Sequence, residues 1–287
     1  MFSIPLKKKI NPIIYNPRKN NANRVILFTN ARNEARIGEW AAHHLLLGFD
    51  NIVIFDHKST VPIASVLSDF NNRIIIKRCD LDGAIKIPLM KTAVFIAKKT
   101  KADWMLYLDA DEFLCLNAFS NIKQMLKYYH FADSLGINWV MFGSNHHVKE
   151  PKELMVESYT KSVSTVDQHV KSFVRPETVV DVISPHYFEI YNCSRMFGMP
   201  FKKMKPPYTF NSTNLPKENV GAYIAHYIYQ SEETYIKRKV KLPSDDVGTF
   251  RSTIENIHIH YNIIENNDLK NKYANSIKEL VKLIIRK

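Results

Sequence analysis

The order of apolar and polar residues predicts a buried parallel sheet in the N-terminal half of the chain. Residues 25–28, 51–55 and 104–108 are short, mostly apolar runs, which are typical of strands buried on both faces. Between the first two runs lies a helical pattern that passes through Trp40 and stops at Gly48, a residue type common just after a helix end. Because parallel strands need a crossover connection, this strand–helix–strand order favours parallel pairing.

The alternation of strand and helix extends over the first 130 residues. A helix is predicted at residues 61–69, a strand at 73–76, and an amphipathic helix at 86–100 with Pro88 in its first turn. Repeated alternation of this kind is typical of a doubly wound α/β sheet, and we expect that fold class.

Beyond residue 135 the predicted elements become shorter. They are three strands of a mixed sheet, a further strand, a helix and a basic amphipathic tail helix, at residues 139–142, 169–174, 179–183, 221–227, from Ser231 onward and 267–287. We therefore expect three parts: a basic N-terminal arm at 1–23, one α/β domain at 24–240, and a C-terminal helical extension at 241–287 that packs on the domain.

The chain is strongly basic. Lys and Arg number 40 against 28 Asp and Glu, a formal net charge of +12. Such an excess attracts nucleic acid, an anionic membrane surface or phosphate-bearing small molecules, and charge alone does not choose among them. The basic runs at 7–9 and 237–241 are interpreted as solvated faces, with contact to phosphate or lipid as the alternative.

Cysteine usage and hydropathy bear on where the protein is expected to act. The 3 cysteines are far apart and form no C-x-x-C spacing, which favours a reducing compartment. No run of about 18 apolar residues is present, so no transmembrane segment is expected. We expect a cytoplasmic protein of a microbe or virus, with peripheral membrane contact through its basic ends left open.

The acidic triplet Asp109-Ala110-Asp111 carries the candidate chemistry. It directly follows the apolar run 104–108, and ligands of open α/β sheets bind outside the carboxyl ends of the strands. Two carboxylates there are costly unless they share a cation, and Mg²⁺ or Mn²⁺ takes carboxylate oxygens together with phosphate oxygens. A solvated turn is the alternative. The strand context and Asp56, at the end of another strand, favour a metal–diphosphate site, although Asp56 alone fits a helix N-cap equally well.

Further motifs accompany the triplet in a fixed order. They are Arg32-Asn33-Glu34, Glu39-Trp40, His44, Leu47-Gly48, Phe55-Asp56, Trp104, Leu108 to Phe113, Phe142-Gly143-Ser144 with His147, Lys171-Ser172, Arg175-Pro176, Pro185-His186, His226-Tyr227 and Ser231-Glu232-Glu233. In this order and spacing, over residues 24 to 240, the chain resembles the glycosyltransferases of GT-A fold that include glycosyltransferase family 92 and enzymes of the family 2 type.

The resemblance implies a Rossmann-like, mixed and mostly parallel sheet flanked by helices that binds a nucleoside diphosphate sugar with Mn²⁺ or Mg²⁺. A uridine diphosphate sugar is the expected donor and a hydroxyl of a glycan or glycoprotein the expected acceptor, with inversion at the anomeric carbon. By analogy with the family, the nucleotide is assigned to Thr29, Arg32, Glu34, Asp56 and Asp109. The metal is assigned to Asp109, Asp111 and His226, with His186 as the second choice of histidine.

An inverting transfer also needs a general base to deprotonate the acceptor hydroxyl. The usual Glu-Asp pair is missing where the fold would place it, so His186, Asp181 and Glu157 stay open as candidate bases. Ser144, His147 and Trp139 are candidates for the donor or acceptor pocket, with core packing as the alternative for Trp139.

Two other functions use some of the same residues. A nucleotidyltransferase acting on sugar phosphates also needs a carboxylate-bound metal, but its usual Gly-rich phosphate loop is absent from residues 29–34. A basic nucleic-acid-binding protein would interleave aromatic and basic residues on one face, whereas the aromatic residues here mostly lie inside apolar strands. The sequence therefore favours a glycosyltransferase.

Overall fold

The computed structural model describes residues 22–250 and 256–286. The N-terminal arm expected at residues 1–23 lies almost wholly outside the described residues. The strands of the first half and the helices between them are β1 Val25–Ala31, α1 Ile37–Leu46, β2 Asn51–His57, α2 Ile63–Val66, β3 Ile74–Cys79, α3 Lys86–Lys99, β4 Trp104–Tyr107, β5 Glu112–Leu116 and α4 Ile122–Tyr128.

The second half contains more, and mostly shorter, elements. They are β6 Ser134–Met141, α5 Met155–Ser158, β7 Lys161–Ser162, β8 Val170–Val174, β9 Val179–Asp181, β10 Glu189–Ile190, β11 Met196–Gly198, β12 Lys202–Lys203, β13 Ala222–His226, α6 Glu232–Tyr235, a π-helical turn Ile236–Val240, β14 Ile264–Glu265 and α7 Asp268–Ile284. Turns of 3-10 helix occur at Pro176–Thr178, Cys193–Arg195, Lys217–Asn219 and Ile257–Ile259.

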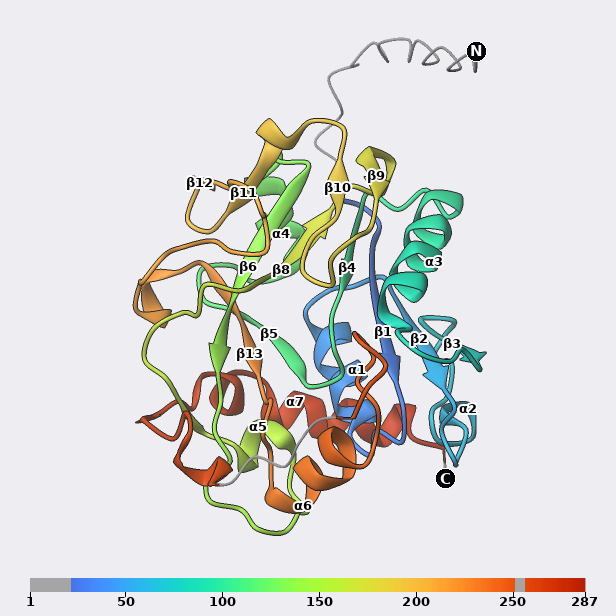
Figure 1. The fold of residues 1–287 in the computed structure, drawn as a ribbon, viewed down its shortest axis with the longest axis vertical. Helices are drawn as coiled ribbons and strands as arrows, with labels where there is room; N and C mark the ends of the chain where they lie inside the picture. Colours follow the sequence, from blue (N-terminus) through green and yellow to red (C-terminus); the bar gives the residue numbers. More distant parts are fainter. Residues whose placement is uncertain (1–21, 251–255, 287) are drawn as a thin grey trace, which may run out of the picture.

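A 10-stranded mixed sheet forms the centre of the protein, with the main order β12-β11-β6-β8-β4-β1-β2-β3 (Figure 1). Strands β4, β1, β2 and β3 are parallel to one another, and β8 runs antiparallel between β6 and β4. β13 pairs in parallel with β6 and antiparallel with β5. The expected α/β class, with a mixed, mostly parallel and Rossmann-like sheet flanked by helices, is confirmed.

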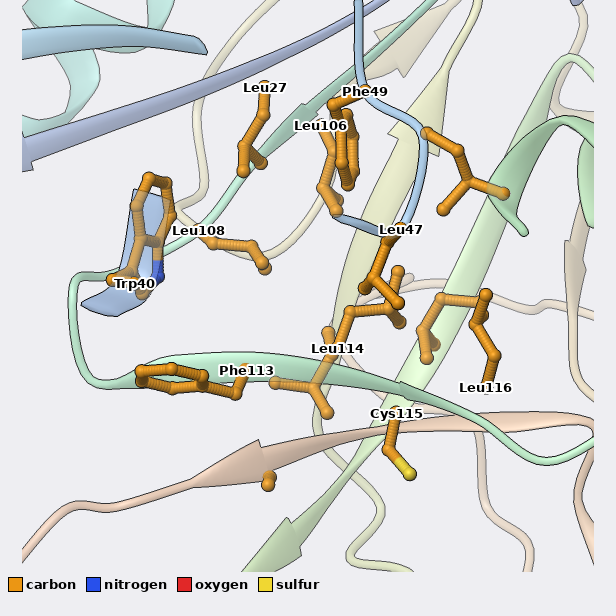
Figure 2. Packing of buried hydrophobic residues seen from close by; sticks show 14 of the residues in the cluster. Leu27, Trp40, Leu47, Phe49, Leu106, Leu108, Phe113, Leu114, Cys115 and Leu116 are labelled. Atoms are coloured by element: carbon orange, nitrogen blue, oxygen red, sulfur yellow. The ribbon is translucent and has the colours of Figure 1, made fainter. Parts of the chain in front are cut away.

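Both faces of the sheet are buried under apolar side chains. Successive side chains of a strand point to opposite faces, so neighbouring residues belong to different clusters. In β1 and β4, Leu27 and Leu106 belong to one apolar cluster, whereas Ile26 and Met105 belong to the other. The first cluster includes α1, α4 and α7, and the second includes α3. Figure 2 shows Leu27, Leu106 and Leu108 on the same side as Trp40 of α1, with β5 alongside. Continuous apolar runs therefore mark strands covered on both sides.

Helix α7 covers α1 on the outside of the first cluster, and it also contacts α5 (Figure 1). Its apolar stripe supplies Leu269, Ala274, Ile277 and Ile284 to the core. Burial of this stripe is what an amphipathic helix requires, and it fixes the C-terminal segment on the sheet. Within the described part of the chain, none of the helices has both the length and the hydropathy needed to span a membrane.

Two local features differ from the sequence prediction. The segment 61–69 forms only the four-residue helix α2, because Leu67 already has extended backbone. Strand β5 was not predicted: Glu112 starts it immediately after the acidic triplet, and all five of its residues are buried. The triplet is therefore a tight connection between two strands.

Candidate functional site

A cavity of about 240 Å³ opens at the carboxyl ends of β1 and β4. It is lined from β1 by Asn30 and Ala31, from the triplet by Asp109 and Asp111, and from the neighbouring strands β6, β8 and β13 by Trp139, Lys171 and His226. The segment 242–246 lines it as well. This is the edge at which an open α/β sheet binds its ligand.

Asp109 is held by two lysines from distant elements. Lys171 of β8 places its Nζ 3.0 Å from Asp109 Oδ2, and Lys86 at the start of α3 donates to the other carboxylate oxygen. Burial opposes ionisation of this carboxyl, but Lys171 and Lys86 outweigh it and hold the pKa of Asp109 well below its ordinary value. The Glu112 carboxyl accepts a hydrogen bond of 2.8 Å from the Asp109 backbone N–H, which fixes the turn.

Asp111 is 1% exposed and faces three nitrogen-bearing side chains. Its Oδ2 lies 3.0 Å from Lys239 Nζ and 3.5 Å from Arg238 Nη1, and its Oδ1 lies 3.9 Å from His226 Nε2. Burial again disfavours the charged form, but these neighbours together hold the pKa of Asp111 below its ordinary value. Asp111 is therefore ionised at neutral pH.

Asp111 and His226 fit a divalent ion with open coordination positions. Burial lowers the pKa of His226 to about 4, although Asp111 opposes this shift, so the imidazole is neutral at pH 7 and able to bind a metal. Among the described residues there is no group of three or more His, Cys, Asp or Glu side chains that could hold a metal. That is acceptable for Mg²⁺ or Mn²⁺ in a nucleotide site, because phosphate oxygens and water complete the coordination.

The basic run at 237–241, expected to be a solvated face, is one only in part. Lys237 is exposed and pairs with Glu233, but Arg238 bridges Glu34 at 2.8 Å and Asp111, and Lys239 pairs with Asp111. The helix that begins at the Ser231 cap continues as a π-helical turn over Ile236–Val240. Such wide turns often occur at functional sites, and this one carries Arg238 and Lys239 to the lining of the cavity.

Two of the predicted nucleotide-binding residues, Arg32 and Glu34, also line the cavity. The Arg32 Nε is buried and has no hydrogen-bond partner within the described part of the chain, which leaves it available to an anion. Thr29 and Asp56 do not line the cavity. The Thr29 hydroxyl donates to the Asn30 carbonyl, and the Asp56 carboxylate accepts from the backbone N–H groups of Ser59 and Ile63 and pairs with Arg78.

A neighbouring cavity of about 350 Å³ shares Glu34 with the first one. It is mostly apolar, with Ile37, Val61 and Ile63 among its lining residues and the hydroxyls of Ser59 and Thr60 at the Asp56 turn. Glu34 therefore stands between a strongly charged cavity and an apolar one.

Of the three candidate bases, His186 alone lines the cavity. Its Nδ1 lies 3.0 Å from the Val170 carbonyl oxygen, and its ring lies against Trp139, which also contacts the His226 ring. Burial, followed by Lys171, lowers the pKa of His186 to about 4. Asp181 instead pairs with Lys91, and Glu157 with Lys278.

Trp139 lies in the cavity, but the other two predicted pocket residues do not. Ser144 is fully buried and its hydroxyl is bonded to His258 Nδ1, while His147 is bonded to the Ser158 carbonyl. Both hold the loop after β6 in place, because each joins it to another segment.

Several cavity residues were not proposed from the sequence. Lys86 and Lys171 pair with Asp109, and Lys86 also donates to the side-chain oxygen of Asn30. The Asn30 amide N–H donates in turn to Asp245 at 2.6 Å. In the sequence, Lys171 belongs to the motif Lys171-Ser172, and Lys86 stands at the predicted start of an amphipathic helix. Asp245 carries no local signal.

Residues 94–266 match the sequence profile described as glycosyltransferase family 92. A glycosyltransferase family 92 protein of rice, Oryza sativa subsp. japonica, is 26% identical over 186 residues, a match that covers 60% of this chain and 30% of the rice protein. The chain thus spans less than a third of the length of that relative.

Two solved structures are similar at low level. A cytidylyltransferase from Leptospira borgpetersenii matches 54% of this chain and 60% of its own at 12% identity, with a TM-score of 0.27. A putative glucose-1-phosphate thymidylyltransferase from Bacillus anthracis matches 54% of this chain and 72% of its own at 12% identity, with a TM-score of 0.31. Scores this low carry no argument about function. The family match, in contrast, covers more than half of the 287-residue chain and includes the acidic triplet, Lys171, His186 and His226, so the chain belongs to glycosyltransferase family 92.

Proposed function

We propose that this protein transfers a sugar from a uridine diphosphate sugar to a hydroxyl of a glycan or glycoprotein, with Mn²⁺ or Mg²⁺ and with inversion. The observation that carries the proposal is the pair Asp111 and His226, which faces a cavity lined by Arg32, Arg238 and Lys239. A hard cation needs oxygen or nitrogen ligands, and a diphosphate needs positively charged side chains. This cavity supplies both.

Asp111 and His226 would hold the divalent ion. When bound, the ion would neutralise the charge that develops on the leaving diphosphate. Arg238 and Lys239, which balance Asp111 in the free protein, would then face the diphosphate oxygens together with Arg32. Lys86 and Lys171 keep Asp109 ionised and in place, so that it can accept a hydrogen bond from the donor.

The donor nucleoside fits the apolar cavity beside Glu34. A uracil ring has flat faces that match the aliphatic walls, and its edge carries two carbonyl groups and an N–H that can bond to the hydroxyls of Ser59 and Thr60. Glu34 lies at the junction of the two cavities, where its carboxylate can accept a hydrogen bond from a ribose hydroxyl. In this arrangement Asp56 acts indirectly, because it fixes the turn that carries these hydroxyls.

His186 is the general base of the proposal. A backbone carbonyl only accepts hydrogen bonds, so the contact with Val170 places the proton on Nδ1 and leaves the Nε2 lone pair free. In the transfer, the acceptor oxygen bonds to the anomeric carbon as the bond from that carbon to the diphosphate breaks. The acceptor proton goes to His186 Nε2, and the nucleoside diphosphate leaves.

A thermal-shift panel tests the donor part of the proposal. Wild type, Asp111→Asn and the exposed control Asp69→Asn are heated with uridine, guanosine, cytidine and thymidine diphosphate sugars, each with Mn²⁺ or with EDTA. We expect the uridine diphosphate sugars to raise Tm with Mn²⁺ in wild type and in the control, and not in Asp111→Asn. The absence of any nucleotide-dependent shift in wild type would contradict the proposal.

A further inference from the structure

Besides the first cavity, at Asp111, and the apolar cavity beside Glu34, a further cavity of about 530 Å³, called the second cavity below, lies at the end of strand β6 that carries Met141. Trp139 lines the first cavity, and the His169 ring is stacked on it with centroids 5.2 Å apart. His169 Nδ1 lies 2.7 Å from Asp167 Oδ1, and Asp167 lines the second cavity. A short chain of three touching side chains thus connects the two spaces.

The strands give the same adjacency. β6 and β13 are paired in parallel so that Met141 is the register partner of His226. Met141 lines the second cavity and His226 lines the first. The backbone N–H of Asp167 also donates to the Trp139 carbonyl at 2.7 Å. The relative position of the two cavities is therefore fixed by the sheet.

The second cavity has a different chemical character. Its polar lining consists of hydroxyl, amide and carboxylate groups, among them Thr165, Asp167, Gln168, Thr213 and Asn214. No Lys or Arg belongs to the described residues that line it. In a chain with a net charge of +12, a site for an anion would be expected to use some of the abundant cations. The lining instead suits a neutral ligand with many hydroxyl groups.

Tyr261 supplies an aromatic wall with a fixed orientation. Its backbone has φ 63°, in the left-handed region that a tyrosine adopts at some cost, and its ring is stacked on Tyr229 with centroids 5.5 Å apart. Burial, together with the charge of Asp167, raises the pKa of Tyr261, so its hydroxyl stays protonated. An aromatic face next to hydroxyls and amides can contact both the C–H and the O–H groups of a pyranose.

We propose that this second cavity binds the acceptor, a neutral oligosaccharide, whose terminal hydroxyl reaches the first cavity beside Trp139 and His186. The inference rests on the proposed function for the identity of the ligand as an acceptor. Asp167 accepts hydrogen bonds from sugar hydroxyls, the Gln168 amide both donates to them and accepts from them, and Tyr261 stacks on one ring. Because the described residues that line the cavity include no Lys or Arg, we expect neutral glycans to be preferred over sialylated, sulfated or phosphorylated ones.

Direct binding tests the proposal without the donor. Saturation-transfer NMR is recorded with neutral gluco-, galacto-, manno- and xylo-oligosaccharides and with sulfated and sialylated oligosaccharides. The variants are Gln168→Ala, which removes an exposed amide, and Asn214→Trp, which fills the cavity. Asn219→Trp is the control, because Asn219 is exposed a few residues further on and does not line the cavity.

We expect at least one neutral oligosaccharide to bind wild type and Asn219→Trp, with affinity lowered about tenfold or more in Asn214→Trp and less in Gln168→Ala. The thermal shift by nucleotide and Mn²⁺ stays unchanged in all variants, which also shows that they are folded. Preferential binding of the acidic oligosaccharides, no binding of any neutral one, or equal binding by Asn214→Trp would overturn the inference. Loss of the nucleotide shift in wild type would instead count against the proposed function alone.

Discussion

Lys171 Nζ and Asp109 Oδ2 form an ion pair of 3.0 Å in which the lysine side chain is only 2% exposed. The two residues are 62 positions apart in the chain and meet because β8 lies antiparallel next to β4. The pair connects strand β4, which precedes the acidic triplet, to strand β8, which carries Lys171. It therefore makes the site part of the folded core.

The first prediction concerns the stability that depends on this pair. In Lys171→Met, the partly buried carboxylate of Asp109 loses one of its two lysines, so we expect the free energy of unfolding to fall by about 3 kcal/mol, the lower end for a broken buried pair because Lys86 remains. Urea denaturation measures it. Lys270→Met, at an exposed position of α7, serves as the control. A loss below about 1 kcal/mol would show that Asp109 does not need Lys171.

A second prediction uses the basic run 237–239, which contains its own control. Lys239 faces Asp111 in the cavity, whereas Lys237 points to solvent and pairs with Glu233. Lys239→Gln should weaken binding of uridine diphosphate with Mn²⁺ by about tenfold, because it removes a charge from the anion site. Lys237→Gln should leave it unchanged. Titration calorimetry compares the two, and equal effects would contradict the placement of Lys239.

The third prediction separates chemistry from donor binding. His186→Asn keeps an amide near the Val170 carbonyl but removes the base, so kcat for release of nucleoside diphosphate should fall by about 100-fold or more. The KM for the donor should change little, since His186 holds no part of the nucleotide in the proposal. His130→Asn, at an exposed position, is the control. A kcat near that of wild type would exclude His186 as the base.

A fourth prediction concerns stability at acid pH. His43 is fully buried with its Nε2 bonded to the Leu114 carbonyl, and burial lowers its pKa to about 4 although that hydrogen bond opposes the shift. The unfolded chain, with an ordinary histidine pKa near 6.5, binds a proton between these pH values and the folded protein does not. Stability should therefore fall as pH decreases from about 6.5 to 4.

The share of His43 should be about 1.6 kcal/mol between pH 6.5 and pH 5, because a full pKa unit corresponds to 1.36 kcal/mol and the unfolded histidine is only half protonated at pH 6.5. Unfolding by urea at several pH values should give a shallower dependence for His43→Gln than for wild type. His130→Gln should keep the wild-type dependence. Burial also lowers the pKa of His44, so the pH dependence of stability in His43→Gln should be reduced and not abolished. Parallel curves for His43→Gln and wild type would contradict the prediction.

The sequence predicts the parts of the fold that depend on local pattern. Strands β1, β2 and β4 are continuous apolar runs, and α7 has a regular apolar stripe, so each could be identified before the structure. β5 could not be separated from the turn before it, because Glu112 continues an acidic segment and its burial depends on β13. The helix predicted at 61–69 ends at Val66 because Leu67 has extended backbone and pairs with Ile285 of the C-terminal segment.

The candidate site was predictable only in its acidic half. Asp109 and Asp111 stand next to an apolar run, which is a signal within a few residues. Their cations come from Lys86, Lys171 and Arg238, and these contacts exist only after strands and helices have been arranged. The same reason left three candidate bases open: the contact that orients His186 is made to Val170, which no spacing rule relates to it.

The central claim is metal-dependent sugar transfer through Asp111, and release of uridine diphosphate from a uridine diphosphate sugar tests it most directly. Wild type and Asp111→Asn are compared with Mn²⁺ and with EDTA, and circular dichroism checks that the variant is folded. The account predicts release by wild type that needs Mn²⁺ and that falls by about 100-fold or more in Asp111→Asn. Turnover in EDTA equal to that with Mn²⁺, or wild-type turnover by a folded Asp111→Asn, would contradict it.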